Sequence, residues 1–129
     1  MTAVHKRANY QRARIDRALP YQVALPDEFC CMENYTVIAE FCRRFDPAPE
    51  HRSITAIWPD GTQKKMRLHC FASRADAEVF AAHFEGEHFD PVRDRGKGER
   101  RDAWRRTGSW VNVDHFGPLK LPRFFRDNP

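Results

Sequence analysis

Long hydrophobic runs are missing from this chain of 129 residues. No stretch reaches the roughly 18 apolar residues that a membrane-spanning helix needs. The basic N-terminal segment is not followed by an apolar one, as a secretory signal would be. We therefore expect a soluble, cytoplasmic protein that has no membrane partner. A hydrophobic content of 41%, with ten Phe and three Trp, still suffices for one compact core of ordinary domain size.

Motifs of catalysis and cofactor binding are also lacking. The sequence has no Walker loop, no glycine fingerprint of dinucleotide-binding proteins and no G-x-S-x-G nucleophile motif. His69 and Cys70 are neighbours on an expected strand, so their side chains point to opposite faces and cannot form a nucleophile and base pair. We expect no cofactor and lean toward a protein without catalytic activity. An enzyme would have to assemble its site from distant histidines, such as His69, His83 and His115.

Paired cysteine spacing is absent as well. The four cysteines show no C-x-x-C pattern and lie in apolar stretches, which favours reduced, packed thiols over a disulfide framework or a zinc site. They are Cys30, Cys31, Cys42 and Cys70. The densest cluster of metal-ligating types contains His83 and His88, whose spacing is off register on a helix and is interrupted by Gly86. We predict no metal site.

The charge layout is the most informative feature that the sequence does have. Residues 1–20 carry five basic and one acidic side chain, residues 21–91 carry seven and twelve, and residues 92–129 carry ten and five. The formal net charge of +4 therefore comes from the two ends, where cations can reach a partner without disturbing a core. We predict a basic N-terminal arm over 1–20, with only a weak helical stripe, and a compact core over 21–91. A basic loop and extended tail over 92–129 would pack on the core or on a partner.

A first amphipathic helix is predicted from Asp27 to about Phe45. Pro26 suits the first helical position, and Asp27 places negative charge in the first turn. At about 100° per residue most apolar side chains of this stretch fall on one arc, and Asn34 is the polar residue among them. The prolines of Asp46-Pro47-Ala48-Pro49 then end the helix.

The strongest local signal is a β-hairpin. Residues 53–58 and 62–71 read as strands around Pro59-Asp60-Gly61, in which Pro59 fixes φ for a turn and Gly61 accepts a positive φ. Alternation gives the second strand an inward apolar face around Leu68 and an outward face with a basic stripe. The stripe consists of Lys65, Arg67 and His69.

A second helix is predicted to follow the hairpin. Ser73 suits the N-cap with Asp76 three residues later, and Gly86 closes the helix after about Glu85. A two-stranded hairpin cannot hide its own apolar face, so it needs these helices or a further strand, for which 109–114 is β-prone. The predicted class is α+β: a small single domain with an amphipathic helix, an antiparallel hairpin extendable to three or four strands, a second helix and a long irregular C-terminal tail.

Arginines interleaved with tryptophans make nucleic acid, DNA or RNA, the first-ranked ligand. Guanidinium forks match phosphate oxygens, while aromatic rings can stack on bases or brace the backbone. The predicted contacts are Arg12, Arg14, Arg17, Lys65, Arg67, Arg100, Arg101, Trp104, Arg105, Arg106 and Trp110. They would give affinity with little sequence specificity. The competing interpretation is an ordinary solvated loop, partly neutralised by its own acidic residues, with Trp104 folded back on the core.

A protein-interaction module or inhibitor is the alternative. The apolar, proline-bearing tail could add to the sheet of a protein partner or close a homodimer. Its predicted interface residues are Leu119, Leu121, Phe124 and Phe125. Wrapping of the tail over its own domain would use the same side chains equally well.

Overall fold

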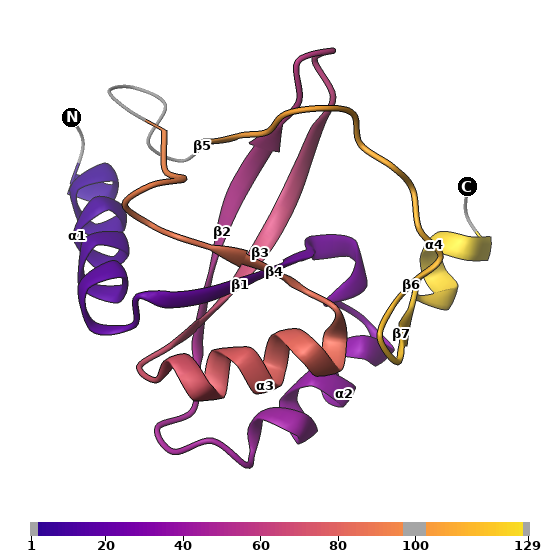
Figure 1. The fold of residues 1–129 in the computed structure, drawn as a ribbon, viewed down its shortest axis with the longest axis horizontal. Helices are drawn as coiled ribbons and strands as arrows, with labels where there is room; N and C mark the ends of the chain where they lie inside the picture. The colour runs from indigo at the N-terminus through magenta and orange to yellow at the C-terminus, as the bar shows by residue number, and fades with distance from the viewer. Residues whose placement is uncertain (1–2, 97–102, 128–129) are drawn as a thin grey trace.

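The computed structural model describes residues 3–96 and 103–127 of the chain. Within these ranges an α+β fold contains four α-helices, a curled five-stranded sheet and a small two-stranded sheet (Figure 1). The strands of the large sheet are β1 (Tyr21–Pro26), β2 (Glu50–Ile57), β3 (Gln63–Phe71), β4 (Glu87–Phe89) and β5 (Ala103–Arg105). The small sheet pairs β6 (His115–Phe116) with β7 (Leu119–Lys120). The helices are α1 (Ala3–Ala18), α2 (Glu33–Cys42), α3 (Arg74–Phe84) and the short α4 (Arg123–Asp127).

The order of the strands shows a doubled split β-α-β arrangement. The sheet runs β4-β1-β3-β2-β5, and its first four strands pair antiparallel with their neighbours. Each of the units β1-α2-β2 and β3-α3-β4 therefore leaves room for one strand of the other unit, which is the ferredoxin-like connectivity. Strand β5 extends this sheet by pairing parallel with β2. Five strands exceed the three or four that the sequence suggested.

The β2-β3 hairpin forms around the predicted turn, although β2 begins at Glu50, three residues earlier than expected. The backbone N–H of Trp58 donates to the Thr62 carbonyl at 2.9 Å, and that of Gly61 donates to the Trp58 carbonyl at 2.9 Å. Gly61 has the expected positive φ of 91°. The strand predicted at 109–114 is wrong, because this stretch carries no regular structure and 103–105 supplies the additional strand instead.

The first predicted helix is shorter than expected. Residues 21–26 form strand β1, a 3-10 turn covers Asp27–Phe29, and α2 begins only at Glu33. Met32 interrupts the helical path with a φ of 56°. The break is stabilised from a distant strand, since the Arg67 guanidinium pairs with Asp27 at 2.8 Å and donates to the Cys30 carbonyl at 3.3 Å. A local helical pattern cannot show such a partner.

Helix α3 forms as predicted at its start and differs in detail at its end. The Asp76 N–H donates to Ser73 Oγ at 3.3 Å, which is the expected cap. At the other end Glu85, with a φ of 53°, takes the left-handed position. Gly86 is needed for a different reason: a Cβ at this residue would lie 2.6 Å from Val23 Cγ1, so only glycine lets the chain pass this close to β1.

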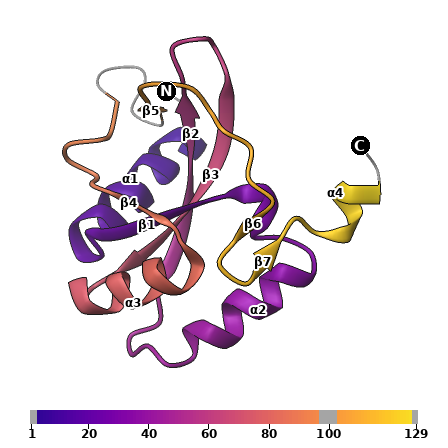
Figure 2. The same cartoon turned by 45° about the vertical axis from the view of Figure 1, so that its right-hand side comes forward.

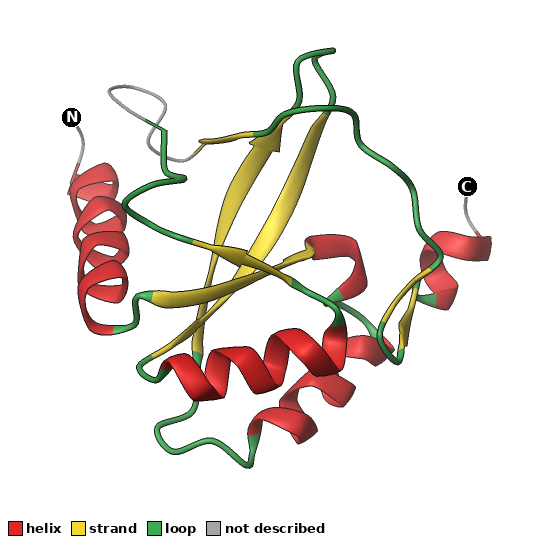
Figure 3. Cartoon of the chain, viewed as in Figure 1, coloured by secondary structure: helices red, strands yellow, loops and turns green. Residues whose placement is uncertain are grey.

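Both faces of the large sheet are buried. On one face lie α2 and α3, as Figure 3 shows. Val23, Leu25 and Phe71 belong to the buried cluster that these helices form with the sheet. On the other face lies a second cluster that includes Leu68 and Trp104 together with Ile15 and Leu19, which flank the C-terminal end of α1. The buried clusters thus extend beyond residues 21–91 into both ends of the chain.

The polar residue on the apolar arc of α2 has a structural role. Asn34 is buried, and its Nδ2 donates to the Lys120 carbonyl at 2.7 Å. Leu119 beside this carbonyl is buried in the same core as α2 and α3. The C-terminal segment therefore wraps over its own domain.

All four cysteines are free thiols, and Cys30 and Cys70 are buried, as predicted. In the part of the chain that the structure describes, no helix has the length and apolar character to cross a bilayer.

Candidate functional site

The two arginine-rich ends of the chain lie side by side. Figures 1 and 2 both show α1 next to the segment that leaves β4. Asp16 of α1 and Arg93 of that segment line the same cleft, and Arg95 forms a β-bridge with Trp104. We use the name arginine face for the arginines that α1 and the segments around β5 carry. They are Arg12, Arg14, Arg17, Arg93, Arg95, Arg105 and Arg106.

Several acidic groups on this face already have an arginine partner. Glu50 pairs with Arg14 at 2.8 Å, and this hydrogen bond holds the pKa of Glu50 below its usual value. Asp94 pairs with Arg93 at 2.8 Å, which likewise lowers the pKa of Asp94.

Positive charge remains on the arginine face after this pairing. Glu87 pairs with Arg106 at 2.7 Å. Arg17, Arg95 and Arg105 are exposed and have no acidic partner within residues 3–96 and 103–127. The face therefore keeps several cations directed to solvent.

The tryptophans do not offer the stacking surface that the sequence suggested. Trp104 is only 4% exposed and packs edge-on against Phe89 at 5.1 Å. The guanidinium of Arg106 covers its ring at 3.9 Å. In this structure Trp104 is not open to a base, and it is folded back on the core as the competing interpretation expected.

Trp110 is half-buried and is also engaged within the chain. Its ring meets Trp58 edge-on at 5.2 Å, and its indole N–H donates to Asn112 at 2.7 Å. The Lys64 ammonium lies 5.3 Å from the same ring. The tryptophans thus brace the segments that carry the arginines.

The side of β3 that carries the predicted basic stripe does not face solvent. Arg67 is bound to Asp27, and His69 is 5% exposed, because this side of the sheet is covered by α2 and α3. Lys65 is exposed but approaches the same aspartate at 3.9 Å. The error has a clear cause: a strand covered on both faces does not keep a polar side for solvent. Arg100 and Arg101 lie outside the described residues.

The predicted interface residues of the tail divide into two groups. Leu119 is buried, and Leu121 packs against the same core. The backbone N–H of Arg123 donates to Glu33 at 2.9 Å, which ties the next residues to α2. Phe124 is 55% exposed and contacts the ring of Phe125 at 5.3 Å.

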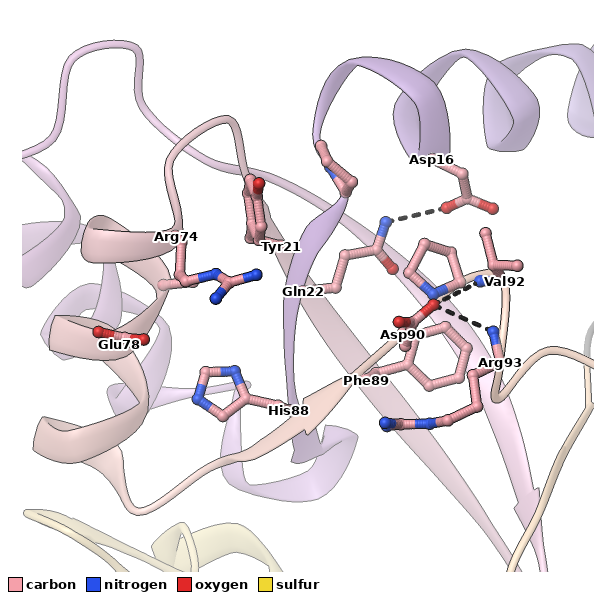
Figure 4. Close-up of a pocket in the computed structure, with 13 residues that line it drawn as sticks. Asp16, Tyr21, Gln22, Arg74, Glu78, His88, Phe89, Asp90, Val92 and Arg93 are labelled. Atoms are coloured by element: carbon pink, nitrogen blue, oxygen red, sulfur yellow. Dashed lines mark hydrogen bonds between the residues drawn. The ribbon is translucent and has the colours of Figure 1, made fainter.

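A polar cleft of about 480 Å³ adjoins the arginine face (Figure 4). Arg74 from α3 and His88 from β4 point into it from one side, and Arg93 reaches it from the other. The carboxylate of Asp90 accepts hydrogen bonds from the backbone N–H groups of Arg93 and Val92, and these bonds lower its pKa. The mixture of cations and carboxylates makes this a hydrophilic groove with no dominant charge.

The wall of this cleft contains a buried amide. Gln22 is 1% exposed, and its Nε2 donates to Asp16 at 2.9 Å and to the Leu19 carbonyl at 3.1 Å. Asp16 also pairs with Arg52 at 3.0 Å. This network fixes the end of α1 against β1 and β2, so these polar residues have a structural role.

The three histidines considered for catalysis have different surroundings. His69 lines a cavity next to His51, whereas His83 stacks on Phe41 at 4.1 Å. His115 pairs with Asp114 at 2.7 Å on the surface. Among the described residues, no three or more His, Cys, Asp or Glu side chains are grouped so as to hold a metal ion.

Comparison with models of protein families, with curated proteins and with solved structures found no match. The ferredoxin-like connectivity by itself supports many unrelated activities. The residues of this chain are therefore the indication of its function.

Proposed function

We propose that this chain is a non-catalytic accessory or regulatory protein that binds nucleic acid through phosphate contacts made by the arginine face. The observation that supports this proposal is the meeting of α1 with the segments around β5, which brings the two basic ends together. Guanidinium groups bind phosphate oxygens well, and several close cations act together on a polyanion.

Low sequence specificity follows from the same geometry. Trp104 is buried under Arg106, so it is not available to stack on a base. The sheet face opposite α2 and α3 is covered by Ile15 and Leu19. Phosphate contacts fix position and supply affinity, whereas base contacts read sequence. We therefore expect single- and double-stranded oligonucleotides of many sequences to bind.

A protein partner held by the C-terminal tail has less support. Leu119 and Leu121 already pack against their own core, and Asn34 holds the backbone between them. Phe124 remains as the exposed aromatic side chain of that segment. One exposed ring is a small surface compared with a typical interface of about 800 Å² per partner.

The test compares two triple variants that remove the same charge. Arg17, Arg95 and Arg105 become Ala in the first, and Arg43, Arg123 and Arg126 become Ala in the control. The control arginines are exposed at the end of α2 (Arg43) and on α4 (Arg123 and Arg126), away from α1 and β5. Binding of labelled single- and double-stranded oligonucleotides is measured over a series of salt concentrations.

We expect wild type and control to bind with steep salt dependence. Each lost phosphate contact reduces the slope of log K against log salt by about 0.7–0.9. The first variant should therefore show a slope smaller by about two to three. Absence of binding at low salt, or equal losses in the two variants, would contradict the proposal.

A further inference from the structure

A second cavity, of about 260 Å³, lies between α2 and the strands β2 and β3. Most of its wall is apolar: Tyr35, Ile38 and Ala39 come from α2, and Ala48 and Pro49 come from the loop before β2. For comparison, an apolar protein cavity of about 150 Å³ can hold benzene. The space therefore suits a molecule with one ring and a few additional atoms.

The arginines in the wall of this cavity have no acidic counterpart there. They are Arg43, at the end of α2, and Arg67 on β3. Within the described part of the chain, no Asp or Glu side chain lines the cavity. Burial raises the pKa of Cys30 to about 12 and that of Cys42 to about 11, so the thiols in the wall keep their protons. The wall therefore offers positive charge without a competing anion.

The two arginines differ in their availability to a ligand. The guanidinium of Arg67 pairs with Asp27 at 2.8 Å and donates to the Cys30 carbonyl at 3.3 Å. The Arg43 side chain is 79% exposed, and its ion pair with Glu40 is long, at 3.9 Å. An exposed pair of this kind contributes little to stability. The Arg43 guanidinium is therefore accessible to another carboxylate.

We propose that this cavity binds a small monocarboxylate whose apolar ring lies against α2 and whose carboxylate pairs with Arg43. The apolar wall removes the ring from water, and a guanidinium can donate two parallel hydrogen bonds to a carboxylate. None of the residues in the wall belongs to the arginine face. Occupation of the cavity does not depend on nucleic-acid binding.

Benzoate, benzamide and benzamidinium test this proposal, because they share one shape and are respectively anionic, neutral and cationic at neutral pH. Each is titrated into the intact chain, and binding is followed by NMR through the methyl signals of Ile38 and Ala48. The methyl signals of Val79, exposed on α3 and outside the cavity, are the internal control. We expect benzoate to bind about fivefold more tightly than benzamide, as for one exposed bidentate ion pair. Benzamidinium should bind less tightly than benzamide.

Two matched variants assign the charge to one side chain. Arg43→Gln removes the cation from the wall, so benzoate and benzamide should then bind equally well. Arg44→Gln is the control, since this neighbouring arginine is exposed, does not line the cavity and lies over the Phe41 ring at 3.8 Å. It should keep the fivefold preference for benzoate.

Either of two results overturns the proposal. One is that benzoate at its highest soluble concentration leaves the methyl signals of Ile38 and Ala48 unchanged. The other is that the preference for benzoate persists in Arg43→Gln, or is lost to the same extent in Arg44→Gln.

Discussion

At the scale of single residues, His69 has the least expected surroundings. It lies on β3, packs against the Phe80 ring at 4.7 Å and is almost fully buried. A buried histidine is a source of acid sensitivity, because the unfolded chain takes up a proton that the folded protein excludes.

This leads to a prediction about pH. The pKa of His69 falls from 6.5 to about 3 on folding, so its protonation favours the unfolded state at every pH below about 6.5. The stability that neutral His69 contributes is fully present above pH 6.5. As the pH falls from about 6.5 to about 3, this contribution decreases by up to about 1.4 kcal/mol for each pH unit.

Urea unfolding of wild type and His69→Phe between pH 7 and pH 4 measures the effect. The free energy of unfolding of wild type should decrease more steeply with acid than that of the variant. Parallel curves for the two proteins would show that His69 takes up its proton equally in the folded and unfolded states.

At the scale of elements, the link between α2 and the C-terminal segment depends on Asn34. Asn34→Ala removes the donor to the Lys120 carbonyl, and we expect the free energy of unfolding to fall by about 1 kcal/mol. Trypsin should also cleave faster after Lys120 and Arg123. Thr36→Ala, at an exposed position of α2, is the control and should change neither measurement. Equal cleavage rates in the two variants would exclude this role.

Elements with local signals were the predictable ones. The β2-β3 hairpin and the start of α3 depend on Pro59, Gly61 and Ser73, which act on their immediate neighbours. The break before α2 and strand β5 depend on partners far along the chain, Arg67 and β2. No periodicity within a short window carries that information.

The same reasoning explains what was missed in the candidate sites. The arginines and tryptophans could be selected from the sequence, but their ion pairs and the burial of Trp104 arise only from the fold. The cavity at His69 was missed because β3 was interpreted with one solvent face. The apolar partner residue Val23 on β1 was a signal that this face is also covered.

At the scale of the whole molecule, α1 is held on the sheet by two ion pairs of different kinds. Asp16 and Arg52 have side chains only 11% and 8% exposed, whereas Glu50 and Arg14 are 46% and 40% exposed. Removing one partner of a buried pair leaves a charge without compensation, which costs about 3–5 kcal/mol. An exposed pair contributes less than about 1 kcal/mol.

We therefore predict a contrast between two matched substitutions. Asp16→Ala should lower the free energy of unfolding by about 3 kcal/mol, and Glu50→Ala should lower it by less than about 1 kcal/mol. Thermal and urea unfolding at neutral pH provide the measurement. Similar small losses in both variants would mean that α1 is held by Ile15 and Leu19 alone.

The parallel pairing of β5 with β2 has a consequence for the order of folding. The paired residues Thr55 and Ala103 are far apart in sequence, whereas β2 and β3 are joined by a short turn. Contacts that close long loops form late, since the entropy of closure is lost before the contact is gained. We expect β5, the edge strand that carries Arg105, to join the sheet last. The arginine face would then be complete only on fully folded molecules, so partly folded chains would bind the proposed nucleic-acid ligand less tightly.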